Sequence, residues 1–538
     1  MVATAAKVAV RVRSHRLSEL SPAASVVPGV TTPPPGATGL SARRLIFGLV
    51  SLQIVAGVLG AFYTPLLTPI ARNVGMRDAD WNWFDSALAA VAAFALPLLT
   101  KLGDVVGHRR VLVATTVVVA ASSWLAVIAT DFWTLFAAFA LQGFISVWLP
   151  FELALIRDAT PPEQTERRIA KISSVLTVFF LVGSVLATVV GGQLFTVNGG
   201  WDALQNGLDA GVAPADIAGF RESLLAVLLI PAVISTLAIP AVAFLIPKPT
   251  ARVVDLGGDQ QLGLSGLLAV GMIVVGIVLG FGAVKLGGAA LVPGWIIVAA
   301  SVLSVVPFLR WQSRAATPAI DIAVLRDRRR GPYLIGGVFF TVVYSTATVP
   351  SVTFFATDPQ TYGYGIGATP ADISVIMLAM ILTIIVVASL TTRVTKPATR
   401  IWLLRIAPFF FAAEFGWLFV FHDSLWHAVV TAVLGGIGAG VLVPGLPAAI
   451  AIAAPAGRVA ADIGVANILS IVGATAGSAV FALALHDTAD STVTAAPLSG
   501  YMAVWIITIA LSFVLAAILW SARPPLADAP VMEVPDVR

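Results

Sequence analysis

The sequence predicts an all-α, polytopic membrane protein. Mean hydropathy is +0.95, and 58% of the 538 residues are hydrophobic while only 11% are charged. A soluble domain is about half apolar and about a quarter charged. The apolar residues also form runs of about 20 residues, which is the helix length needed to cross about 30 Å of hydrocarbon. Helices are expected because they satisfy their own backbone hydrogen bonds without water, and the runs lack the alternation of barrel strands.

The apolar runs predict fourteen transmembrane helices. Taken in order along the chain, the predicted spans are 45–67, 82–101, 111–130, 133–156, 170–192, 222–246, 263–284, 291–310, 333–356, 371–392, 401–421, 426–453, 463–485 and 500–521.

Basic residues predict the orientation of these spans. If both termini are cytoplasmic, most Lys and Arg residues between positions 43 and 523 fall in cytoplasmic loops or at cytoplasmic helix ends. The exceptions on the outer side are Arg72, Arg77, Arg221 and Lys285. Positive charge is enriched on the cytoplasmic side of membrane proteins, and a miscounted span would scramble every later loop. The bias therefore supports both the count and a place in the cell (plasma) membrane with both termini inside.

The segments outside the spans are short. Residues 1–41 include "VVPGVTTPPPGATG" and lack the apolar core of a cleaved signal, so they predict a disordered cytoplasmic tail. Residues 523–538 form a second cytoplasmic tail. The longest outer loop lies between 192 and 222, with room for one short surface helix.

Several function classes are disfavoured by absent patterns. The chain has no cysteine, which excludes disulfides and Cys-ligated metal. It has no ATP-binding G-x-x-x-x-G-K-[ST] loop, no H-E-x-x-H and no G-x-S-x-G, so neither an enzyme nor a cofactor is expected. His422 and His427 would lie on different helix faces, so no metal site is expected. Basic residues occur in short scattered clusters, so nucleic acid is not an expected partner.

The loop after the second span carries the most informative motif. "TKLGDVVGHRR", residues 100–110, contains Asp104, Gly107, Arg109 and Arg110. Glycine allows a tight turn with positive φ, the arginines can hold the loop on the anionic inner face, and the aspartate can bind cations or a helix N-terminus. By charge alone, an ordinary cytoplasmic loop explains the same residues.

With the predicted spans around it, this loop resembles the signature of the major facilitator superfamily, G-x-x-x-D-x-x-G-R-[KR]-[KR]. Thr100 replaces the first glycine and His108 the first basic residue. The resemblance implies that Asp104, Gly107 and the two arginines form a loop that takes part in a conformational switch.

Two further segments resemble superfamily patterns. "GSVLATVVGG" is similar to the exporter pattern G-x-x-x-G-P-x-x-G-G at Gly183, Gly191 and Gly192, although Ala187 and Thr188 replace a glycine and the proline. Small residues at this spacing allow two helices to approach closely, so plain helix packing is the alternative interpretation.

"ALQGFISVWLPFELALI" resembles the R-x-x-x-G segment of the fourth span, but Phe139 stands where the arginine would be. In the first span, Gly60 stands where fourteen-span drug exporters carry an aspartate. Proton coupling is therefore implied by the family resemblance alone.

The second half repeats the plan of the first, since "LTTRVTKPATR" at 390–400 follows the tenth span as the signature loop follows the second. The resemblance implies two six-helix bundles, 42–247 and 332–522, joined by 248–331 with two inserted helices. "VLGGIGAGVLVPGLPAAIA" in the twelfth span and "VANILSIVGATAGSAVFALAL" in the thirteenth resemble the corresponding spans of fourteen-span drug:proton antiporters. This resemblance implies multidrug efflux of hydrophobic or amphipathic small molecules, and we expect a lipid-embedded monomer. A non-transporting membrane protein on the same scaffold and an uptake carrier remain alternatives.

Ionisable residues at bilayer depth are functional candidates because each costs about 2.5–3.5 kcal/mol to insert. Asp85, Glu152 and Glu414 are the acidic candidates for coupling. Asp85 can also be an interfacial acid, Glu152 can form an ion pair with Arg157, and Glu414 can be a neutral acid packed between helices. The uncharged candidates to line a cavity are Gln53, Gln142, Tyr344 and Asn467.

Overall fold

Helices and turns build the part of the chain that the structure describes. The computed structural model describes residues 39–158, 165–246, 264–286, 288–315, 322–394, 396–454, 459–485 and 495–523, and these ranges contain no strand. Of the tails, only 39–41 and 523 lie inside the described residues. The chain from Arg43 onward forms one compact unit, and the unit before it contributes only the start of the first helix.

We call the helices before residue 247 the N-group. They are α2 (Gly39–Ala61), η1 (Thr64–Leu66), α3 (Leu67–Asn73), η2 (Asp78–Asp80), α4 (Trp81–Val106), α5 (His108–Ile128), α6 (Phe132–Gln142), η3 (Gly143–Val147), α7 (Trp148–Asp158), α8 (Thr165–Val197), α9 (Gly200–Asp209), η5 (Pro214–Asp216) and α10 (Ala218–Leu245). The short helix α9 lies in the loop for which one was predicted.

An inserted segment follows the N-group. It consists of α11 (Leu264–Leu286), η6 (Gly288–Ala290), α12 (Leu291–Gln312) and α13 (Ile322–Arg326).

We call the remaining helices the C-group. They are α14 (Gly331–Thr341), the π-helical turn η7 (Val342–Thr346), α15 (Thr348–Ala356), α16 (Pro359–Tyr362), α17 (Pro370–Thr392), α18 (Pro397–Val420), α19 (Leu425–Ala453), α20 (Val459–Ala484) and α21 (Leu498–Ser521).

Every predicted span lies on helical structure. Among the described residues, twelve segments are long and apolar enough to cross a membrane. The other two predicted spans coincide with α4 and α11, which have 26 and 23 residues but are not among those twelve. The all-α membrane fold is thus confirmed, and the count of fourteen crossings stays a prediction.

Three spans that were expected as single helices are broken. The first is interrupted at η1, the fourth at η3 between α6 and α7, and the ninth at the π-helical turn η7. Pro65 lies in the first break, and Gly143 opens the second. Breaks of this kind change the winding of a helix, so the side chains that follow point to a different side than an unbroken helix would give.

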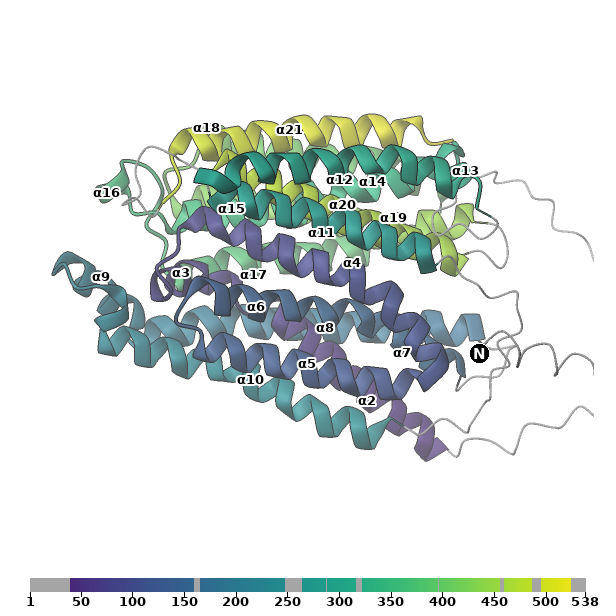
Figure 1. Cartoon of the computed structure of the whole chain (residues 1–538), viewed down its shortest axis with the longest axis horizontal. Helices are drawn as coiled ribbons and strands as arrows, with labels where there is room; N and C mark the ends of the chain where they lie inside the picture. The colour runs from purple at the N-terminus through teal and green to yellow at the C-terminus, as the bar shows by residue number, and fades with distance from the viewer. Residues whose placement is uncertain are drawn as a thin grey trace, which may run out of the picture. The chain divides into compact units, whose positions relative to one another are not determined.

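The two groups meet along two pairs of helices. α4 packs against α20, and α8 packs against α17. Inside each group the third long helix packs on the sixth, as α5 on α10 and α18 on α21. The inserted helix α11 packs against both α4 and α20, and α12 packs on α11 (Figure 1).

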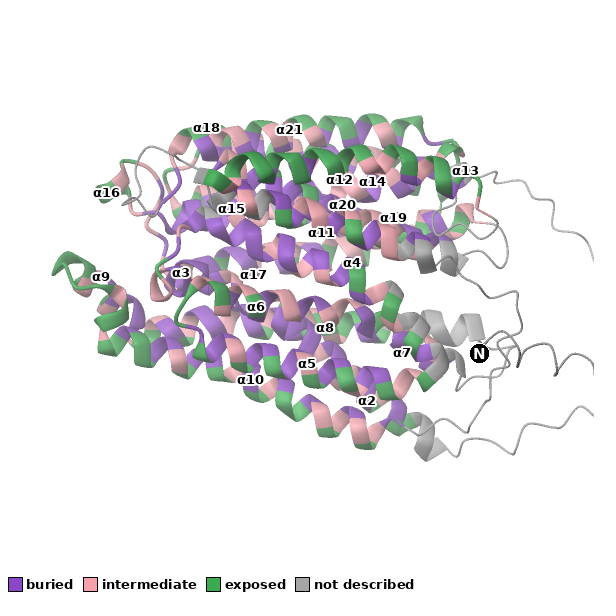
Figure 2. Ribbon diagram, viewed as in Figure 1, coloured by how far each residue is buried: buried purple, intermediate pink, exposed green. Residues whose placement is uncertain are grey.

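Burial separates interior from lipid-facing surfaces. α12 is exposed along most of its length (Figure 2), and apolar side chains such as Ile296 and Leu303 are more than 60% exposed on it. Exposed apolar residues at this density are what a lipid-facing helix requires.

The helix ends define two ends of this unit. We call the end that carries α3, α9 and α16 the α9 end (Figure 1). We call the opposite end, where α4 turns into α5 at Gly107, the Arg109 end.

Candidate functional site

A buried carboxylate forms the centre of the site. Glu152 of α7 has no exposed surface, and Gln53 of α2 is 7% exposed. The Gln53 side-chain amide donates a hydrogen bond of 2.5 Å from Nε2 to Glu152 Oε2, while no described residue forms a hydrogen bond with Glu152 Oε1. A neutral amide cannot compensate a buried charge, so this carboxylate requires a proton, water or a cation at Oε1. The structure brings together these two predicted residues.

The break in the fourth span positions Glu152. Asp131 caps α6 by accepting hydrogen bonds from the Thr134 hydroxyl and from the backbone of Thr134 and Trp133, which lowers the pKa of its carboxyl. At η3, Gly143 packs so closely on α4 that a Cβ atom there would lie 3.0 Å from Val91 Cβ and closer still to the Leu88 carbonyl oxygen. The tighter winding of η3 then sets the direction of the side chains along α7.

Further unsatisfied polar atoms lie on the same broken helices. Among the described residues, Trp148 Nε1 is buried without a hydrogen-bond partner, and Tyr63 Oη and Gln142 Nε2 form no hydrogen bond of good geometry, although Tyr63 interacts with Gln142 and Ser123. Trp148 lies one helical turn before Glu152, and Gln142 lies close to Tyr63. Ten residues separate Gln142 from Glu152, which corresponds to roughly 15 Å along a helix. We call Gln53, Tyr63, Gln142, Trp148 and Glu152 the Glu152 site. It contains one carboxyl group and several polar side chains in the interior of the N-group.

Phe139 explains how the fold accommodates the missing arginine. Its ring lies 5.1 Å from Tyr63, 5.4 Å from Trp81 and 5.5 Å from Phe84, and only 7% of its surface is exposed. Aromatic packing therefore fills the position that a cation holds in the superfamily pattern.

The other acidic candidates lie elsewhere. Asp85 is half-buried on α4, and no hydrogen bond joins it to Glu152 in the described residues. Glu414 lies on α18 against Gly435 of α19. The Arg157 side chain lies outside the described residues, so the predicted pair with Glu152 is not tested.

The C-group candidates do not join Glu152 either. Tyr344 lies in the π-helical turn, with its ring stacked on Phe340 at 5.4 Å. Asn467 is exposed on α20.

The signature loop turns at Gly107, whose φ of 101° is open to glycine and strained for other residues. Arg109 donates from Nε to the Ile246 carbonyl oxygen at 2.8 Å and from Nη2 to that of Ala243. These carbonyls end α10, so the arginine caps that helix. Arg110 is exposed and bonds Val106 at 3.4 Å. The Asp104 side chain lies outside the described residues.

The loop also contacts the helix that carries the carboxylate. His108, which replaces a basic residue of the signature, has its ring centre 5.7 Å from that of Phe151. A Cβ atom at Gly103 would lie 2.5 Å from Phe151 Cε1. Movement of this loop therefore reaches the residue next to Glu152.

The C-group contains an arginine cap that the sequence did not single out. Arg405 of α18 donates from Nη2 to the Ala522 carbonyl oxygen at 2.9 Å, and its guanidinium lies 5.5 Å from the ring of Trp520. Ala522 ends α21. Arg109 and Arg405 thus both tie a third helix to the end of a sixth. The signal was the repeat itself, but Arg405 lies beyond the motif at 390–400.

The predicted packing glycines lie at close helix contacts. A Cβ atom at Gly183 would overlap the Ile54 carbonyl oxygen of α2, and one at Gly191 would lie 3.0 Å from that of Phe62. A Cβ atom at Gly192 would overlap Ser374 Oγ and the Pro370 carbonyl oxygen of α17. Ser374 donates a hydrogen bond of 2.7 Å to the Thr188 carbonyl oxygen. The two groups are therefore in tight contact at the α9 end of α8.

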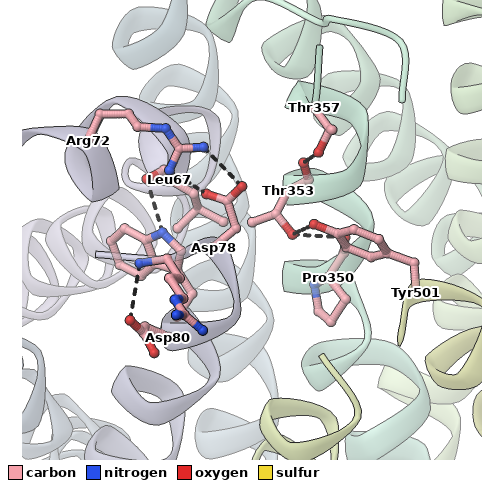
Figure 3. A network of polar contacts seen from close by, with 10 residues as sticks. Leu67, Arg72, Asp78, Asp80, Pro350, Thr353, Thr357 and Tyr501 are labelled. Carbon is pink, nitrogen blue, oxygen red and sulfur yellow. Dashed lines mark hydrogen bonds and ion pairs between the residues drawn. The ribbon is translucent and has the colours of Figure 1, made fainter. Parts of the chain in front are cut away.

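A buried ion pair lies beside this contact. Arg72 binds Asp78 through two hydrogen bonds of 3.1 Å, and Asp78 is 1% exposed. Burial raises the pKa of Asp78, and the guanidinium opposes that shift. Figure 3 shows the pair facing Thr353 and Tyr501 of the C-group, where the Tyr501 hydroxyl donates to Thr353 at 3.4 Å. Sequence analysis named none of these as site residues because no local pattern marks them.

Comparison with known proteins decides the family. The profile of the Major Facilitator Superfamily matches residues 49–478. The chain belongs to the Major Facilitator Superfamily. The predicted superfamily is thus confirmed, and the finer drug:proton antiporter type stays a prediction.

Curated relatives within the superfamily match over a limited region. The uncharacterized MFS-type transporter EfpA of Mycobacterium tuberculosis is 27% identical over 173 residues, covering 31% of this chain and 32% of EfpA. The putative uncharacterized transporter YgaY of Escherichia coli is 28% identical over 154 residues, covering 28% of this chain and 38% of YgaY. The chain therefore matches about a third of the length of these relatives.

Solved superfamily structures share the fold. The nucleoside transporter NupG aligns with a TM-score of 0.55 at 13% identity, covering 90% of this chain and 98% of NupG. A peptide transporter in complex with sulfate aligns with a TM-score of 0.60 at 16% identity, covering 92% and 98%.

Proposed function

We propose that this chain is a secondary active transporter that exports hydrophobic or amphipathic small molecules by alternating access. The fully buried Glu152, with one neutral partner and one unsatisfied oxygen, carries the proposal. A protein that served only as a scaffold would gain nothing from the cost of burying such a group. Superfamily membership and the broken first, fourth and ninth spans support the same function.

The proposal includes fourteen crossings of the cell membrane. In it, α4 and α11 cross the membrane in addition to the twelve segments given above. Both termini lie in the cytoplasm, because the basic residues lie mainly at the Arg109 end. The segments 42–247 and 332–522 move as two bundles around the insert 248–331. Since Gly192 and Ser374 bring the groups into contact at the α9 end, the described state is closed to the outside.

The signature loop fixes the helices of the N-group to one another at the Arg109 end, opposite this contact. Gly107 makes the turn, and Arg109 fixes the start of α5 to the end of α10. His108 and Phe151 transmit the position of the loop to α7. Asp104 and Arg110 complete the loop as the superfamily signature implies.

Glu152 is the proposed proton carrier. In the protonated state Glu152 is neutral and accepts a hydrogen bond from the Gln53 amide. A neutral side chain can be buried in a closed interior at lower cost than a charged one. A guest that is cationic or rich in hydrogen-bond donors would displace the proton when it reaches Oε1. Export of the guest is therefore coupled to entry of a proton. Asp85 remains a second candidate for the proton path.

Efflux of ethidium, a lipophilic cation, tests this function. Cells that express the chain are loaded with the dye, and liposomes with the purified chain and trapped pyranine report proton movement. Glu152→Gln keeps the shape of the side chain and removes its charge. Glu222→Gln makes the same change at an exposed position of α10 and serves as the matched control.

We expect the parent and Glu222→Gln to expel the dye and move protons, with Glu152→Gln at least tenfold slower. Equal rates in both variants would remove Glu152 from the mechanism. If adding the dye left the pyranine signal unchanged in every sample, no protons would move with the dye. That result would favour a non-transporting scaffold. Dye accumulation above that of empty cells would identify an uptake carrier.

A further inference from the structure

A second carboxylate, which is half-buried, lies in the C-group. Both carboxylate oxygens of Glu414 on α18 would lie 2.5 Å from a Cβ atom at Gly435 of α19, so the carboxylate occupies the space that this glycine leaves open. No hydrogen bond or ion pair joins Glu414 to another side chain in the part of the chain that the structure describes. An anion at this depth therefore lacks the cation that would stabilise it.

The packing of α18 on α19 holds Glu414 in place. Leu404 and Phe411 of α18 lie against Gly445 and Gly438 of α19, as Glu414 lies against Gly435. These side chains repeat along one face of α18, so moving the carboxylate away from α19 would disturb the contacts on either side.

Aromatic side chains flank the carboxylate along the helix. On one side, Phe411 lies 6.4 Å from Tyr344 in the π-helical turn, and Tyr344 is close enough for an electrostatic interaction with Glu414. On the other side, Trp417 lies 4.5 Å from Phe421. Within the described ranges, the buried Trp417 indole nitrogen has no hydrogen-bond partner, so a second polar atom one turn from Glu414 is unsatisfied there.

We propose that Tyr344, Phe411, Glu414, Trp417 and Gly435 form a binding site for an organic monocation, separate from the Glu152 site. A carboxylate supplies the counter-charge, and the half-buried rings of Tyr344 and Trp417 attract a delocalised or quaternary cation. The fully buried Phe411 packs against Tyr344 and supports it. The π-helical turn supports the assignment because such turns are frequent at functional sites. Glu414 and Tyr344 are half-buried, so a ligand can reach them from the surface of the C-group.

Protection from a carboxyl reagent tests the site on the intact chain. Dicyclohexylcarbodiimide modifies carboxyl groups in apolar surroundings, and mass spectrometry of the purified protein in detergent locates the product. Tetraphenylphosphonium is the organic monocation used as the probe. Tetraphenylborate has the same shape and the opposite charge, so it is the control.

We expect tetraphenylphosphonium to slow modification of Glu414 at least tenfold, and tetraphenylborate to leave it unchanged. The same protection is expected in Glu152→Gln, because the two sites are separate. Trp417→Leu should need at least fivefold more probe for equal protection.

An unprotected Glu414 at saturating probe would overturn the proposal. So would protection that disappears in Glu152→Gln, because the cation would then bind at the Glu152 site. Binding is measured here without transport, so a failed efflux assay leaves this result intact.

Discussion

Replacing Gly192 by alanine should open the contact between α8 and α17. The new Cβ atom would overlap Ser374 Oγ and the Pro370 carbonyl oxygen, and overpacking of this kind costs about 1–3 kcal/mol. Capping fixes the start of α17, since Thr369 and Asp372 bond each other's backbone N–H groups, so Pro370 cannot easily move away. The strain should therefore fall on the closed state.

A control variant isolates this effect. Gly416 lies inside α18, and a Cβ atom there would meet nothing within 4 Å. Alanine stabilises a helix interior by about 0.5–1 kcal/mol relative to glycine. Gly416→Ala should therefore leave the closed state unchanged or slightly more stable.

A cysteine at position 368 reports the opening. The natural chain has no cysteine. Ala368 is 4% exposed and lies two residues before Pro370, whose carbonyl oxygen meets Gly192, so a thiol there should react faster with a maleimide when the contact opens. A destabilisation of about 1–3 kcal/mol raises the open population roughly 5- to 150-fold. We expect that increase in labelling rate for Gly192→Ala over Gly416→Ala, with purified protein in detergent. Rates within twofold of each other would refute the close approach.

Three further predictions concern the ends of the helices. Arg109→Gln and Arg405→Gln should each lower the free energy of unfolding by about 1–2 kcal/mol because a helix loses its cap, whereas Arg110→Gln should have little effect in the same thermal unfolding assay. Replacing Arg72 or Asp78 alone should cost about 3–5 kcal/mol, and Arg72→Met with Asp78→Leu should recover most of it; additive losses in the double variant would contradict a coupled pair. Hydrogen bonds from the Arg329 backbone and the Arg330 side chain lower the pKa of Asp327, so its stabilisation is present at neutral pH and lost as the pH falls through the folded-state pKa. Asp327→Asn should therefore lower the thermal midpoint near neutral pH, with a difference that begins to shrink below about pH 5 and disappears only below the folded-state pKa, which lies under 3.8.

The local part of the fold was predictable from the sequence. Long apolar runs predicted helices at each span, because segments in lipid must satisfy their own backbone. The glycine turn at Gly107 also followed from a local rule about positive φ. In contrast, the break at η3 depends on how closely Gly143 approaches α4, which is a tertiary contact that hydropathy does not record.

The candidate site was predictable only as separate residues. Gln53 and Glu152 were both named, since polar groups at bilayer depth are rare, but their pairing joins positions 99 residues apart. Arg405 was missed because its partner is a backbone carbonyl far along the chain. The residue type shows that a polar side chain is costly to bury in the membrane. Its hydrogen-bond partner depends on how the helices pack, which the sequence alone does not show.

The aromatic packing around Phe139 has a consequence for how strictly proton entry is coupled to export. Phe139 stands where the superfamily pattern has an arginine, so this position supplies no fixed positive charge to balance Glu152. A carrier with an ionised Glu152 and no bound guest would have to bury an uncompensated charge when it changes conformation. Conformational cycling without a guest or a proton should therefore be rare. The absence of an arginine at this position would then keep proton entry strictly coupled to export of the guest.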